Sequence, residues 1–325
     1  MPARRGYGRP MRRPALPSVT DDRVPLGVLM MLGFCAVAPM IDVFAKLATA
    51  HVSSGVITLG RFLFQALLML PVLWWMGLSL RMPAGASGLV VARALAVVIS
   101  TVSFVAAVAY MPIADALAIA FVEPFVLMAL AAIALGESVG WRRITASIVG
   151  FAGALFVIQP SFAAFGAVAL LPLVTAVSFA IYMLITRQLS RRIAPVPMQF
   201  HTAWVAVLIC LPMLALGGVT GTGIIQPAWP SALVWWLLFG TGLAASISHL
   251  MMTYALRFAP SATIAPLAYA EIIMAVVVGW VFFRDFPGGM VWLGIAIVTA
   301  SGIYVIHREH VVARDRWRHA DSLPR

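Results

Sequence analysis

Apolar runs of about 20 residues recur along nearly the whole chain, and this feature constrains the fold more than any other. An α-helix rises about 1.5 Å per residue, so each run is long enough to cross a hydrocarbon core about 30 Å thick. Hydrophobic residues make up 62% of the 325 residues and charged residues only 10%. Soluble domains have about 45–50% apolar and about 25% charged residues. The composition therefore excludes a soluble enzyme, a disordered chain and a nucleic-acid-binding domain, and it predicts an all-α integral membrane protein.

The hydropathy pattern predicts ten transmembrane helices. Pro, Gly and Arg interrupt the apolar runs and mark most of the connections between them. The expected spans are residues 25–47, 54–77, 89–109, 113–135, 142–159, 164–185, 198–217, 231–255, 261–283 and 288–307.

Basic residues predict the orientation of these spans. With ten crossings both termini lie on one side, and cytoplasmic segments carry an excess of Lys and Arg. If the termini are cytoplasmic, that side holds 18 basic residues, including an Arg-rich tail at 1–24 that we expect to be disordered and a basic tail at 308–325. The other side holds Lys46, Arg61 and Arg284. Basic tails can also bind nucleic acid or anionic lipid. The concentration of basic residues on one side instead favours a role in setting the membrane orientation. We therefore expect a multi-pass protein of a bacterial inner membrane with both termini in the cytoplasm.

The chain contains an internal repeat. A shift of 148 positions aligns residues 93–158 with residues 241–306, and 13 of the 66 pairs are identical. The pairs include Glu123 with Glu271, an unusual residue to recur inside a membrane span. The alignment therefore predicts that the chain arose by duplication.

Each half of the duplicated chain, residues 25–160 and 161–307, would hold five spans. An odd number of crossings inverts the second half relative to the first. Inverted repeats are a common architecture of secondary transporters, with the substrate site near the bilayer midplane between the halves. The repeat therefore favours a transporter and leaves its cargo undefined.

Residues 111–160 (MPIADALAIAFVEPFVLMALAAIALGESVGWRRITASIVGFAGALFVIQP) resemble an EamA-type transporter of the drug/metabolite transporter superfamily. In the second half, Ile272 stands where the family commonly has proline, and Asp285 replaces a glutamate. The resemblance implies two five-helix EamA repeats around a central cavity. It also implies a cargo such as an amino acid, a vitamin such as riboflavin, S-adenosylmethionine or a drug. The features that carry it are Pro112, Pro124, Gly136, Glu137, Gly150 and Gly153.

Glu123 and Glu271 stand near the middle of their predicted spans. A charged side chain at the bilayer centre costs about 2.5–3.5 kcal/mol on insertion scales. Each glutamate must therefore be protonated, hydrated by a cavity or paired. The functional interpretation is a proton-coupling or cation-binding site, and the structural one is a neutral glutamate that bonds helix to helix.

Other charged residues lie toward the ends of spans. Asp42 and Lys46 share one face of the first span, so they could pair with each other or contact cargo. Arg93 lies inside the third span, and we expect its side chain to snorkel to the interface. Glu137 and Asp285 are expected to pair with a neighbouring Arg.

Polar side chains also recur at helical spacing within single spans. Such stripes either bond helix to helix or line a cavity. His249 is the strongest cavity candidate because histidine can titrate near physiological pH. The stripes are Ser246, His249 and Thr253 on the eighth span, Ser100 and Ser103 on the third, and Thr175, Ser178 and Tyr182 on the sixth.

Enzyme motifs are absent from the sequence. It has no P-loop, HExxH motif, cysteine cluster or nucleophile elbow. We therefore expect no catalytic residue, cofactor or metal, and no ATP-driven pump. The favoured function is secondary transport of a small organic metabolite by alternating access, driven by protons or another gradient, in a lipid-embedded monomer or homodimer. A channel, a non-transporting scaffold and a membrane enzyme without a recognisable motif remain alternatives.

Overall fold

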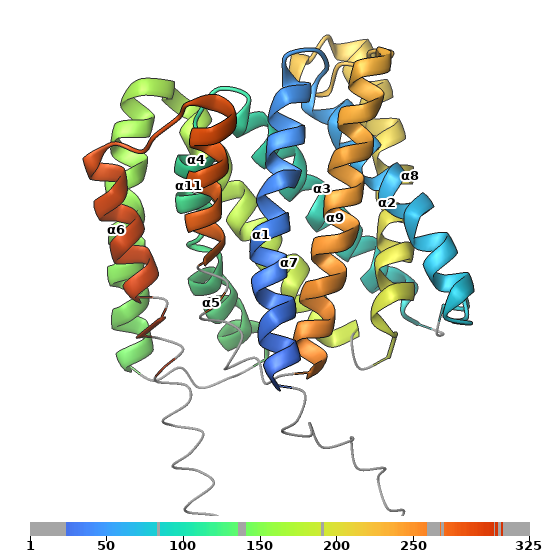
Figure 1. The fold of residues 1–325 in the computed structure, drawn as a ribbon, viewed down its shortest axis with the longest axis horizontal. Helices are drawn as coiled ribbons and strands as arrows, with labels where there is room; N and C mark the ends of the chain where they lie inside the picture. Colours follow the sequence, from blue (N-terminus) through green and yellow to red (C-terminus); the bar gives the residue numbers. More distant parts are fainter. Residues whose placement is uncertain are drawn as a thin grey trace, which may run out of the picture.

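The computed structural model describes residues 24–82, 85–135, 141–189, 192–258, 267, 270–301, 303–304 and 307. Every regular element in these ranges is a helix, as predicted (Figure 1). The α-helices are α1 (Val24–Thr49), α2 (Ser54–Trp75), α3 (Ser87–Val108), α4 (Ile113–Ala120), α5 (Glu123–Leu135), α6 (Trp141–Phe165), α7 (Leu171–Leu189), α8 (Pro195–Thr220), α9 (Ala232–Phe258) and α11 (Ala270–Phe283). Two short 3₁₀ helices, η2 (Gly166–Leu170) and η3 (Gly223–Ile225), and an apolar helix at Gly289–Ser301 complete the described elements.

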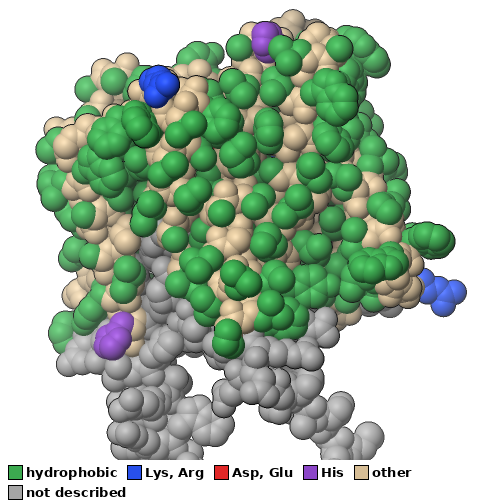
Figure 2. Space-filling model, in the orientation of Figure 1, with side chains coloured by type: hydrophobic (Ala, Val, Ile, Leu, Met, Phe, Trp, Pro, Cys, Tyr) green, Lys and Arg blue, Asp and Glu red, His purple; other side chains and the backbone are tan. Residues whose placement is uncertain are grey.

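The helices form a multi-pass membrane protein. Seven helical stretches of the described residues are long and apolar enough to cross a bilayer, and two shorter apolar helices accompany them. Hydrophobic side chains cover most of the face drawn in Figure 2, as expected of a surface that contacts acyl chains. The count of ten crossings stays a prediction. One of the seven stretches, Ile144–Thr186, contains both α6 and α7, and part of the expected span 261–283 lies outside the described residues.

A glycine separates α6 from α7. Gly166 has φ of 64°, a left-handed conformation that costs glycine little and other residues more. Gly166 is the first residue of the 3₁₀ helix η2, which leads into α7.

The predicted span 113–135 includes Ile113–Leu130, which is long and apolar enough to cross a bilayer, but it is not one continuous helix. Helix α4 ends at Ala120, Phe121 and Val122 form a turn, and α5 begins at Glu123. Pro124 explains the break, because it lacks the N–H that a continuous helix would bond to the carbonyl of Ala120. In the second repeat, α11 begins at Ala270. Glu123 and Glu271 therefore both lie in the first turn of a helix, where the helix dipole stabilises a carboxylate.

Helices of the first repeat pack directly against helices of the second. Helix α1 contacts α9 and α11, α2 contacts α8 and α9, and α3 contacts α7 and α8. Figure 1 shows α1 and α9 side by side at the centre of the bundle. The interior of the bundle is thus an interface between repeats, and the polar residues described below lie in it.

A glycine permits the close approach of α2 and α9. A Cβ atom at Gly242 would lie 2.5 Å from the Cβ atom of Phe64 and 3.1 Å from the carbonyl oxygen of Arg61. Only glycine fits this contact without movement of the α2 backbone. Gly242 therefore helps to place Arg61 at the interface between the repeats.

Candidate functional site

Arg93 lies in the second turn of α3 and is completely buried, with 0% of its surface exposed. Its Nε donates a hydrogen bond to Thr186 Oγ1 (2.8 Å) and its Nη2 to the Tyr182 hydroxyl (2.6 Å). Its Nη1 donates to Thr202 Oγ1 and to the Met198 carbonyl (3.4 Å). The predicted snorkelling of Arg93 is therefore wrong, because oxygens from α7 and α8 bind the guanidinium inside the bundle.

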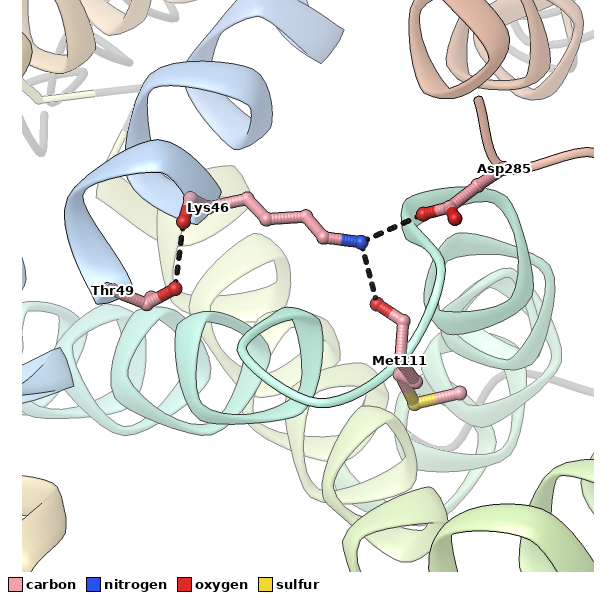
Figure 3. A network of polar contacts seen from close by, with 4 residues as sticks. All are labelled: Lys46, Thr49, Met111 and Asp285. Carbon is pink, nitrogen blue, oxygen red and sulfur yellow. Dashed lines mark hydrogen bonds and ion pairs between the residues drawn. The ribbon is translucent and has the colours of Figure 1, made fainter. Parts of the chain in front are cut away.

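Lys46 makes an ion pair across the two repeats (Figure 3). Its Nζ lies 2.9 Å from Asp285 Oδ2, just beyond α11, and donates to the Met111 carbonyl at 3.1 Å. The Nζ also lies 4.7 Å from the ring centre of Phe283. The predicted partners were wrong for both charges, since among the described residues Lys46 pairs with Asp285 and neither Asp42 nor an arginine takes part in that ion pair. The turn after α11 brings Asp285 to the end of α1, where the flexible lysine stem reaches it.

Asp42 instead faces Arg61 of α2. The two side chains interact electrostatically and line a cavity with Thr101 and Thr241. The cavity has room for about one or two water molecules. Arg61 Nη1 donates to Thr101 Oγ1 (2.9 Å), and its buried Nε has no hydrogen-bond partner among the described residues.

A second small cavity lies between α2, α3, α7, α8 and α9. It has room for about one water molecule. Gln65 Oε1 and His249 Nδ1 are buried without a hydrogen-bond partner among the described residues. His249 interacts electrostatically with both Arg61 and Arg93. The lining residues are Phe62, Gln65, Val97, Tyr182, Gln199, Thr202, Ala203 and His249.

The two intramembrane glutamates belong to an acidic group beside these cavities. Glu271 interacts electrostatically with Glu123 and with Asp42. Glu123 Oε1 is buried and makes no hydrogen bond to the described residues. The structure therefore brings together three carboxyl side chains, two of them identified by the internal repeat and one contributed by α1.

The four serines expected to line a cavity are all buried, but their surroundings are helix contacts. Ser246 Oγ donates to the Gly242 carbonyl of its own helix (2.8 Å). The Ser100 carbonyl accepts a bond from Thr175 of α7 (3.2 Å). The two cavities described above are lined by other residues. The buried serines are Ser100, Ser103, Ser178 and Ser246, and the expected pairing of Glu137 lies outside the described residues.

Sequence reasoning missed several polar residues of these sites. Gln65 and Gln199 are isolated amides in apolar segments. An isolated polar residue in an apolar run is also the signal that identified the two glutamates. Asp115, in the first turn of α4, interacts electrostatically with Lys46 and Asp285. The side chains of Gln65, Gln199 and Asp115 are each less than one-tenth exposed. A search for every isolated polar residue in the apolar runs would have found them.

Comparison with known proteins identifies relatives over most of the chain. The model of the EamA-like transporter family matches residues 25–159 and again residues 166–307, which confirms the two-repeat architecture. The riboflavin transporter of Rhizobium johnstonii is 30% identical over 207 residues, covering 64% of this chain and 66% of that protein. The riboflavin transporter of Vibrio cholerae is 26% identical over 289 residues, covering 87% and 93%.

A third relative and a solved structure extend this comparison. The S-adenosylmethionine uptake transporter of Rickettsia prowazekii is 23% identical over 268 residues, covering 82% of this chain and 88% of that protein. A crystal structure of a protein 17% identical to this chain has a TM-score of 0.60 and covers 86% of this chain and 95% of its own. At that identity the structural likeness shows the fold alone.

Proposed function

Because the chain belongs to the EamA-like transporter family and is a transporter of small metabolites, we propose that it works by alternating access with proton coupling. Relatives named for riboflavin and S-adenosylmethionine support a cargo of vitamin or cofactor size. We place the protein in a bacterial inner membrane as ten spans in two inverted repeats, 25–160 and 161–307, with both termini in the cytoplasm. It acts as a monomer or homodimer.

The observation that carries this proposal is a pair of polar networks that join the repeats at opposite ends of the bundle. Lys46, in the last turn of α1, binds Asp285 of the second repeat. Arg93 lies in the second turn of α3, which α2 separates from the end of α1, and it binds Tyr182 and Thr202 of the second repeat. One of the two cavities is lined by Tyr182 and Thr202, which bind Arg93, and the other by Asp42, one turn of α1 before Lys46. This arrangement supports a state closed at both ends.

Alternating access requires that the two closures open in turn. If the Lys46–Asp285 pair separates while the Arg93 network holds, cargo reaches the cavities from one side only. The reverse arrangement opens the other side. Two related halves that exchange conformations achieve this alternation around one fixed site.

The acidic group supplies a mechanism for coupling. Glu271 interacts electrostatically with both Asp42 and Glu123, and a proton bound within this group relieves the repulsion between carboxylates. Glu123 and Glu271 each lie in the first turn of a helix, so a change in their charge acts on helix ends that move with the repeats. We therefore assign proton binding to Asp42, Glu123 and Glu271.

Flux measurements in proteoliposomes test this function. Purified protein is assayed with labelled riboflavin and a panel of metabolites, first under an imposed pH gradient and then in counterflow without one. In Glu123→Gln and Glu271→Gln, accumulation driven by the pH gradient should be lost while counterflow persists, because exchange needs no net proton movement. The matched control is Glu123→Asp, which keeps an acid at the same position and should keep coupled uptake.

Three results would contradict the proposal. Accumulation that is unchanged in both glutamine variants would remove proton coupling at these residues. A wild-type protein that moves none of the metabolites would favour a non-transporting scaffold, and flux without saturable counterflow would favour a channel.

A further inference from the structure

The cavity lined by Gln65, Gln199 and His249 points to the class of cargo. We propose that this cavity, when opened, binds an uncharged planar heterocycle with adjacent hydrogen-bond donors and acceptors, in preference to a cation. The inference rests on the proposed transport function and specifies the substrate class of the same site.

Two carboxamides supply the polar edge of the cavity. Each glutamine side chain presents one oxygen acceptor and one NH₂ donor, a pattern that matches the edge of a ring amide or imide. Gln65 is 3% exposed and its Oε1 has no partner among the described residues. A buried polar group left unpaired costs about 1–3 kcal/mol, so this atom favours a ligand that donates a hydrogen bond. The unpartnered His249 Nδ1 adds a second such position.

The remaining walls are apolar and pre-organised. Phe62, Val97 and Ala203 are the apolar residues of the cavity lining. Tyr182 is held by the Arg93 guanidinium, 4.3 Å from its ring centre, and by the Phe179 ring at 5.2 Å. Rigid walls with few polar atoms suit a flat ring system, because such a ring gains contact area without losing conformational freedom.

The electrostatic surroundings of the cavity disfavour a cation. His249, on the cavity wall, interacts with Arg61 and with Arg93. Each hydrogen bond given for Arg93 goes to an uncharged oxygen, so no carboxylate in contact cancels that charge. A ligand cation placed here would meet the Arg93 guanidinium in a medium of low dielectric constant, whereas the charge of Arg61 is opposed by Asp42. An uncharged ring avoids this repulsion.

The position of the cavity connects recognition to transport. Its walls come from α2 and α3 of the first repeat and from α7, α8 and α9 of the second. In this conformation it has room for about one water molecule, so a ring system enters only when the repeats separate. Binding would then favour the open conformations over the closed one, because only they accommodate the cargo.

Direct binding measurements test the inference on the purified full-length protein. The probes are riboflavin, lumichrome and uracil, which are uncharged heterocycles with an imide edge, and S-adenosylmethionine, which carries a sulfonium cation. Riboflavin is followed by its own fluorescence, and the others by competition. We expect at least one uncharged probe to bind and S-adenosylmethionine not to displace it. Gln65→Leu and Gln199→Leu should each raise Kd about tenfold, the loss expected for a buried hydrogen bond.

A matched substitution controls for general damage. Gln226→Leu removes an exposed amide beside η3 that does not line the cavity. This substitution should change Kd by less than about twofold. If Gln65→Leu does not fold, Gln65→Glu keeps the shape, removes the donor and adds a negative charge. That variant should lose affinity for uncharged rings and gain it for the sulfonium.

Three outcomes overturn the inference while leaving transport in place. The first is tighter binding of S-adenosylmethionine than of any uncharged probe. The second is an unchanged Kd in both glutamine variants, and the third is binding of none of the uncharged probes by a protein that moves another metabolite. If the wild-type protein moves no metabolite at all, the proposed function fails together with the inference.

Discussion

Lys46 and Arg93 are both cations that join the two repeats, but their partners differ in kind. Lys46 contacts a carboxylate, and the side chains of this pair remain partly exposed, at 16% and 31%. Arg93 is fully buried, and its hydrogen bonds go to three hydroxyls and a carbonyl. The chain neutralises one cation with an opposite charge and holds the other with neutral oxygens.

This difference implies that the two polar networks separate with different ease. A partly exposed ion pair contributes little, because water can solvate both charges when they separate. A buried guanidinium has no such alternative, and its planar fork fixes several helices at once. We therefore expect the Lys46 end to open more readily, while the Arg93 end remains closed and keeps Tyr182 in place.

The largest effect is expected from removal of the guanidinium. Arg93→Met keeps an unbranched apolar stem but removes the guanidinium and its four hydrogen bonds to α7 and α8. The free energy of unfolding should fall by about 2–4 kcal/mol, since interhelical bonds in membranes contribute about 0.6 to 2 kcal/mol each. Denaturant or thermal unfolding in detergent measures it. The control is Arg81→Met, an exposed position, and equal stability of the two variants would contradict the role given to Arg93.

A smaller effect is expected from removal of a single hydroxyl that binds Arg93. Tyr182→Phe removes the acceptor of Arg93 Nη2 and keeps the ring that lies 4.3 Å from the guanidinium. The free energy of unfolding should fall by about 1 kcal/mol, within the range for one hydrogen bond between helices in a membrane, because the ring contact is retained. Tyr254→Phe is the matched control, because that hydroxyl lies at an exposed position against the Met76 sulfur (3.7 Å). If Tyr182→Phe lowers the free energy of unfolding no more than Tyr254→Phe does, the Tyr182 hydroxyl would contribute nothing to the Arg93 network, and only the packing of the ring would.

The same comparison explains how far sequence reasoning reached. Helix positions and the paired glutamates could be predicted because hydropathy and an internal repeat are local or periodic patterns. The Asp42–Lys46 pairing failed because spacing along one helix shows which residues share a face, and not which neighbouring helix approaches that face. The true partner, Asp285, lies 239 residues away in the sequence.

Arg93 was misjudged for a related reason. Snorkelling is the expected behaviour of an arginine near the end of an isolated helix. Its hydroxyl partners, Thr186 and Thr202, lie 93 and 109 residues away and have no charge to identify them. The break before Glu123, by contrast, had a local signal in Pro124, and a stricter use of proline chemistry would have predicted it.

The smallest effect is expected at the Lys46–Asp285 pair, and its dependence on salt is the sharpest test of the comparison. In a double-mutant cycle with Lys46→Met, Asp285→Asn and the double variant, the coupling free energy should be about 0.5–1 kcal/mol. It should shrink at 1 M salt, where the Debye length is about 3 Å, because both side chains are partly exposed. The losses in Arg93→Met and Tyr182→Phe should not change with salt. If the Lys46–Asp285 coupling were equally indifferent to salt, the pair would be as sealed from water as Arg93, and the argument that its end opens first would fail.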